Sequence, residues 1–209
     1  MLMEPAGILA LGFGLGALHA LDADHLLAVT GLSGSETRQS GGLRYCLPWA
    51  LGHGMALFAV GGAVLALDLA IPHRLSAWAE ILVGVLLAYI GARLVGNWWT
   101  ERYPRGEGEA PRSRGAYLVG LIHGTAGTAP LLAVLPAAAM HSEWAGLAYL
   151  AIFCVGVLTA MLAFGGVLGS TIAALARRRD RSLGMARAGI GITAFTMGLV
   201  LVGETWAHG

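Results

Sequence analysis

Six long apolar stretches constrain this chain more than any other feature of its sequence. They cover approximately residues 6–32, 43–67, 75–98, 116–138, 144–172 and 187–202. Each is close to the roughly 20 residues that a helix needs to cross a bilayer. Hydrophobic residues make up 56% of the 209 residues, charged residues only 12%, and the mean hydropathy is +0.70. We therefore predict an all-α integral membrane protein with six transmembrane helices.

The arginines predict the orientation of these helices. All 13 basic residues are arginine, and 11 fall in the first, third and fifth connections or at their edges: Arg38, Arg44, Arg102, Arg105, Arg112, Arg114, Arg177, Arg178, Arg179, Arg181 and Arg187. The positive-inside rule makes these connections cytoplasmic and places both termini outside. We expect a multi-pass protein of the cytoplasmic (inner) membrane, with the lipid bilayer and no nucleic acid as a partner.

The two halves of the chain resemble each other. Gly16, His19, Gly52 and the pair Gly61-Gly62 recur 104 residues later as Gly120, His123, Gly156 and Gly165-Gly166. A repeat with three crossings must enter the membrane the second time from the opposite side, as in many secondary transporters. We predict two inverted three-helix repeats, residues 1–99 and 116–209, joined by a cytoplasmic linker at 100–115 that is rich in Arg, Glu, Gly and Pro.

Four ionisable residues interrupt the first apolar stretch: His19, Asp22, Asp24 and His25. An ionisable group inside a bilayer costs at least ~2.5 kcal/mol, so a cluster of four indicates a function, most simply the binding of a cation. On a continuous helix Asp22 and His25 follow His19 on one face, while Asp24 points away. We therefore expect His19, Asp22 and His25 to bind the ion and Asp24 to orient an imidazole or cap a local break.

Two further histidines, His53 and His123, fall at a similar depth in the second and fourth stretches, and we expect His53 to join the ion site and His123 to close it. The segment 123–130 also holds two glycines, two threonines and a proline, which predict a broken helix with Thr125 and Thr128 facing a cavity. The alternative is a purely structural role, in which each histidine bonds to a backbone carbonyl and the threonines bond back to their own helix. Imidazole with carboxylate suits divalent nickel, cobalt, zinc or iron.

The pattern His19-x4-Asp24-His25 resembles the signature of the nickel/cobalt transporter family, and Leu51-Gly52-His53-Gly54 is similar to its second motif. The segment beginning His123-Gly124 resembles the short six-helix branch related to UreH-type urease accessory permeases. The resemblance implies a permease that imports Ni²⁺ or Co²⁺ as its substrate, with no permanently bound cofactor and no enzyme activity. It carries over His19, Asp24, His25 and His53 as functional positions. Acidic motifs of longer members are absent from the second half.

Several alternatives remain open. A metal exporter, or the membrane component of a multi-subunit metal transporter, would carry the same residues, and neither a homo-oligomer nor an unidentified subunit is excluded. An intramembrane serine protease would use Ser33, which needs a histidine as base. A haem-binding protein would use His19 or His53 with His123 as axial ligands. The single cysteines Cys46 and Cys154 argue against a thiol–disulfide carrier.

Overall fold

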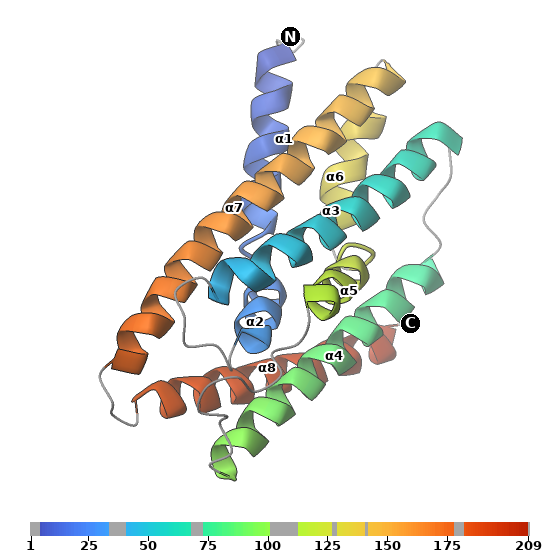
Figure 1. Cartoon of the computed structure of the whole chain (residues 1–209). Helices are drawn as coiled ribbons and strands as arrows, with labels where there is room; N and C mark the ends of the chain where they lie inside the picture. The colour runs from blue at the N-terminus through green and yellow to red at the C-terminus, as the bar shows by residue number, and fades with distance from the viewer. Residues whose placement is uncertain are drawn as a thin grey trace.

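The computed structural model describes residues 5–33, 41–67, 73–100, 113–126, 129–140, 142–177 and 182–208, and within these ranges every regular element is a helix. There are eight: α1 (Pro5–His19), α2 (Ala23–Leu32), α3 (Gly41–Leu67), α4 (His73–Trp99), α5 (Ser113–His123), α6 (Ala129–Ala138), α7 (Glu143–Arg177) and α8 (Ser182–His208) (Figure 1). The prediction of an all-α protein is confirmed. The count of six helices is wrong, because two of the predicted spans consist of two shorter helices each.

The first break separates α1 from α2, whose parts in residues 7–19 and 23–32 meet at an angle of 57°. Asp22 has an extended backbone (φ −60°, ψ 146°) at the N-cap position of α2, so the α-helix cannot continue through it. The two amides before α2 bond three residues back, from Leu21 to Leu18 O and from Asp22 to His19 O. The expected continuous helical face for His19, Asp22 and His25 is therefore wrong.

The second break, between α5 and α6, lies where the glycines and the proline predicted it. α5 ends at His123, and the next amides turn tightly, from Thr125 to Ile122 O and from Ala126 to His123 O. Each break thus directly follows a histidine, His19 in the first half and His123 in the second. The predicted cavity residue Thr128 lies outside the described residues.

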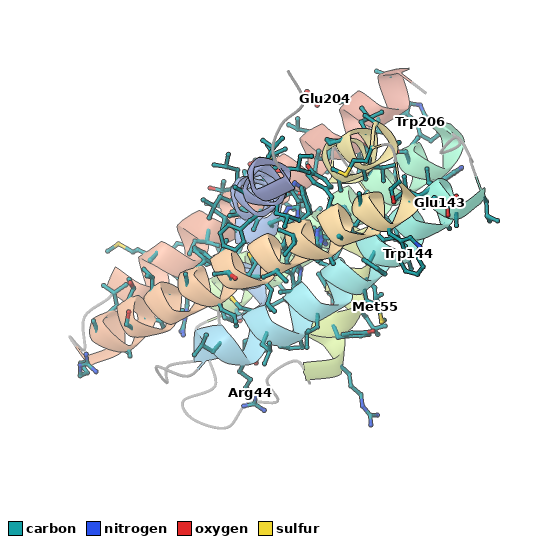
Figure 2. All side chains as sticks on the ribbon, turned by 90° about the horizontal axis from the view of Figure 1, so that it is seen from above. Arg44, Met55, Glu143, Trp144, Glu204 and Trp206 are labelled. Atoms are coloured by element: carbon teal, nitrogen blue, oxygen red, sulfur yellow. The ribbon has the colours of Figure 1, made fainter. Side chains whose placement is uncertain are left out.

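The four long helices α3, α4, α7 and α8 are each apolar and long enough to cross a membrane, and the bent pair α1–α2 adds a fifth candidate. At most 39% of each apolar window is buried inside the protein, so the rest is left for lipid. Exposed tryptophans stand near helix ends, as in membrane-interface belts. Trp144 lies beside Glu143 at the start of α7, and Trp206 lies close to Glu204 at the end of α8 (Figure 2). The chain is a multi-pass membrane protein.

Glycines bring the helices of the two halves into backbone contact. A Cβ on Gly16 of α1 would overlap the carbonyl of Phe153 in α7, and a Cβ on Gly120 of α5 would overlap that of Trp49 in α3. Gly156 and Gly52 meet Phe13 and Tyr117 in the same way. The members of each pair of contacts are related by an offset of 104 residues. α4 and α8 lie side by side as a separate pair (Figure 1), joined at Gly84 with Gly198 and at Gly91 with Gly191.

Candidate metal-binding site

Four histidine side chains gather in the interior where α1, α2, α3 and α5 approach one another. His19, His25, His53 and His123 are all at most 3% exposed. The ring centroids of His19 and His25 are 4.5 Å apart, those of His25 and His53 5.0 Å, and those of His19 and His53 5.4 Å. The two helix breaks make this gathering possible, because they end α1 and α5 on a histidine in the middle of the protein.

His19, His25 and His53 form the tightest group, which we call the three-histidine site. One ring nitrogen of each lies within 4.8 Å of one nitrogen of both others. Among the described residues this group does not include His123, whose ring contacts that of His25 at 5.7 Å. Of the four histidines expected at the ion site, three lie together in this group, and His123 lies beside His25.

Oxygen atoms hold the Nδ1 side of three of the rings. His25 Nδ1 is hydrogen-bonded to Asp24 Oδ1 at 2.8 Å, and His123 Nδ1 to Val119 O at 3.0 Å. His19 Nδ1 lies 2.8 Å from Asp22 Oδ2, an ion-pair contact without the alignment of a hydrogen bond. A ring that donates from Nδ1 presents a lone pair at Nε2. This is the arrangement in which proteins usually hold metal-binding histidines.

The remaining ring nitrogens are buried without a hydrogen-bond partner within the described part of the chain. They are Nε2 of His19, His25 and His123, and both nitrogens of His53. An unsatisfied buried polar atom costs about 1–3 kcal/mol, so several in one place call for an explanation. A divalent cation coordinated by these nitrogens provides one, since imidazole binds such ions in its neutral form.

The two aspartates lie at the rim of the histidine cluster. The side chain of Asp22 is 46% exposed and that of Asp24 26%. Ligand atoms of Asp22, Asp24 and His25 also lie within 4.8 Å of one another. Both carboxylates therefore sit where they can orient an imidazole, the role that the sequence suggested for Asp24 and not for Asp22.

Two aromatic rings that the sequence analysis missed enclose the histidines. Trp49 stacks on His53 with centroids 5.0 Å apart and an interplanar angle of 14°, and its edge meets His25 at 5.0 Å. Phe153 lies 5.9 Å from His19. Trp49 and Phe153 are both fully buried, and they are separated by the repeat offset of 104 residues. That offset is the signal that would have linked them.

The described contacts favour neither the serine protease nor the haem-binding protein. The hydroxyl of Ser33 is buried and donates to Val29 O (2.9 Å) and Thr30 O (3.2 Å) on its own helix, as a structural serine does. The Trp49 indole packs against the rings of both His53 and His123, so a haem held between these two histidines would require this indole to move. Thr125 donates to Ile122 O at 2.8 Å, as the structural alternative expects.

The two cysteines are packing residues on facing helices. Cys46 in α3 packs where a side chain on Gly165 would stand, and the Cys154 thiol of α7 donates to Gly54 O at 3.5 Å. Gly54 lies eight residues beyond Cys46, about 12 Å along α3 at the usual helical rise. The thiols are therefore too far apart for a disulfide without movement of the helices.

Known proteins place the chain in a family. A sequence model described as "Cytochrome C biogenesis protein transmembrane region" matches residues 50–193, which include His53 and His123. The urease accessory protein UreH of Bacillus sp. (strain TB-90) is 27% identical over 183 residues, 82% of this chain and 80% of UreH.

Two proteins of Arabidopsis thaliana are also similar. Chloroplast protein FOR GROWTH AND FERTILITY 2 is 28% identical over 205 residues, and protein FOR GROWTH AND FERTILITY 1 is 31% identical over 193 residues. The matches cover 91% and 81% of this chain but only 55% and 52% of the plant proteins, so the chain spans about half of their length. No solved structure matches. The chain thus belongs to the family of the cytochrome c biogenesis protein transmembrane region and is a homologue of UreH.

Proposed function

We propose that this protein is a secondary-type permease that carries Ni²⁺, or Co²⁺, across the cytoplasmic membrane into the cell. The observation that carries the proposal is the three-histidine site, in which buried ring nitrogens converge without hydrogen-bond partners. The relationship to a protein named for its accessory role to urease supports the assignment. The preference for nickel and cobalt rests on the resemblance of His19-x4-Asp24-His25 to the signature of nickel/cobalt transporters.

The donor set narrows the class of ion. Imidazole nitrogens suit Ni²⁺, Co²⁺, Zn²⁺ and Cu²⁺, whereas Mg²⁺ and Ca²⁺ prefer oxygen ligands. Within the described residues neither group of candidate ligand atoms includes a cysteine, which disfavours Cu⁺. We infer that the cation sheds its water to enter the three-histidine site and that Asp22 and Asp24 offset its charge from the rim.

We further propose that residues 1–99 and 116–209 are inverted repeats and that both termini lie outside. The matched contacts at Gly16 and Gly120, related by the 104-residue offset, support the repeat.

These contacts also constrain how the ion site opens first to one side of the membrane and then to the other. They interlock α1 with α7 and α3 with α5, so rocking one half against the other as rigid bodies would break them. A movement of the α4–α8 pair against the other helices would preserve them, and we favour it.

Metal uptake tests the proposal. Cells that express the protein should accumulate radioactive Ni²⁺ faster than cells with an empty vector, and unlabelled Co²⁺ should compete better than Zn²⁺ or Mn²⁺. Accumulation below that of the empty vector would support the exporter instead. Equal accumulation in both cell lines would count against a permease that works without a further subunit.

The hydrogen bond between His25 and Asp24 leads to a second prediction, on the affinity for Ni²⁺. Asp24→Asn should weaken Ni²⁺ binding to the purified protein about 10–100-fold, because the neutral amide holds the His25 ring less firmly and leaves the bound charge uncompensated. Glu204→Gln is the matched control: it also removes one negative charge, but from the exposed end of α8 (Figure 2). Equal binding by the two variants in a titration followed by calorimetry would contradict an orienting role for Asp24.

A further inference from the structure

His123 differs from the other three histidines in its surroundings. It is 1% exposed, its Nδ1 is fixed by Val119 O, and its Nε2 is buried without a partner within the described residues. It is thus prepared to bind an ion in the same way as His25. Yet the group of ligand atoms within 4.8 Å of one another, among the residues described, leaves it out. Because His123 has a free lone pair at Nε2 but lies outside the three-histidine site, it indicates a separate position for the ion.

His25 connects this position to the three-histidine site. Its ring contacts those of His19 and His53 at 4.5 and 5.0 Å and that of His123 at 5.7 Å. It is the third residue of α2, directly after the break that follows α1. One imidazole therefore faces both positions.

Trp49 contacts both positions as well. Its indole stacks on His53 and meets the ring of His123 at 5.7 Å, with an interplanar angle of 63°. Its backbone carbonyl is held against Gly120 of α5, so a change at Trp49 is confined to the side chain. The indole nitrogen is buried and has no hydrogen-bond partner in the described part of the chain, so nothing anchors the ring by its polar atom.

We propose that His25 and His123 form a second station for the same divalent cation, that His25 passes the ion between this station and the three-histidine site, and that the Trp49 side chain controls the transfer. The inference rests on the proposed function and adds a second binding position to it. The pathway for the ion then runs from α1 and α3 of the first half to α5 of the second.

The test compares His123→Asn with His53→Asn in purified protein and in proteoliposomes. Asparagine at 123 can still donate to Val119 O but lacks the Nε2 ligand, which keeps the fold and removes the station. We expect His123→Asn to bind the first Ni²⁺ within about threefold of the wild type but to transport it at least about tenfold more slowly, because one binding position is lost. His53→Asn should lose both binding and transport.

Two results with His123→Asn would overturn the second station. His123→Asn that loses binding as fully as His53→Asn would make His123 a ligand of one common site, and His123→Asn that transports like the wild type would make it dispensable. If Trp49→Phe neither slows nor speeds transport, the gating role of the indole is wrong. A wild-type protein that neither binds nor transports Ni²⁺ would instead remove the proposed function itself, and the second station with it.

Discussion

Replacing His53 by alanine is expected to abolish tight Ni²⁺ binding. The His53 ring is fully buried in α3, neither of its nitrogens has a hydrogen-bond partner within the described residues, and it completes the three-histidine site. Loss of a partner that merely orients a ligand already costs about 10–100-fold in affinity, so loss of the ligand itself should cost about 100-fold or more. Equilibrium dialysis of the purified protein against Ni²⁺ measures the change.

Phe153→Leu is the matched control for this experiment. Phe153 is also fully buried and lies 5.9 Å from His19, but it offers no ligand atom. If packing around the site were all that mattered, the two variants would lose affinity alike. We expect Phe153→Leu to stay within about threefold of the wild type, the effect of a packing change alone. Wild-type affinity in His53→Ala would show that the three-histidine site does not bind the metal.

Gly16→Ala is expected to destabilise the protein severely. A methyl group on Gly16 would overlap the carbonyl carbon and oxygen of Phe153, which belong to the backbone of α7 and cannot rotate away. Such overpacking typically costs about 1–3 kcal/mol and occasionally more, and we place this change at about 3 kcal/mol because backbone meets backbone. The shift of α1 would also displace His19, three residues further along the same helix.

Gly14→Ala provides the comparison for Gly16→Ala. It makes the same change in the same helix two residues away, where a Cβ would meet nothing within 4 Å. Alanine is the better helix former, so Gly14→Ala should leave the melting temperature unchanged or raise it slightly. Thermal unfolding in detergent, followed by size-exclusion chromatography, distinguishes the two. Equal melting temperatures would contradict the close approach of α1 and α7.

Hydropathy predicts the apolar helices, and the residues that oppose helix formation clearly predict only one of the two breaks. The break after His123 follows from local chemistry, since glycines and Pro130 oppose a continuous helix. The break after His19 has a weaker signal, because Ala20, Leu21 and Ala23 favour helix and only Asp22 and Asp24, as residues that favour helix N-caps, indicate a break. The extended backbone of Asp22 arises together with the burial of His19 among the other rings, which is a tertiary effect.

The sequence singled out the histidines of the candidate site but not the aromatic residues that pack around them. Histidines in apolar stretches stand out because burial makes them costly, whereas Trp49 and Phe153 look like any other aromatic residues of a membrane helix. The sequence also does not indicate that His123 lies apart from the other three histidines. Spacing along the sequence suggests similar depth for His53 and His123, but only the packing of α5 against α3 shows that His123 faces His25 from outside the three-histidine site.

We propose that this chain alone moves a divalent metal ion through the membrane. The most direct measurement loads proteoliposomes with a metal-sensitive dye and follows Ni²⁺ entry with wild-type protein, His53→Ala protein or no protein. We expect saturable entry with the wild type and no entry above the protein-free rate with His53→Ala. If wild-type liposomes fill no faster than protein-free liposomes, the chain alone does not transport Ni²⁺.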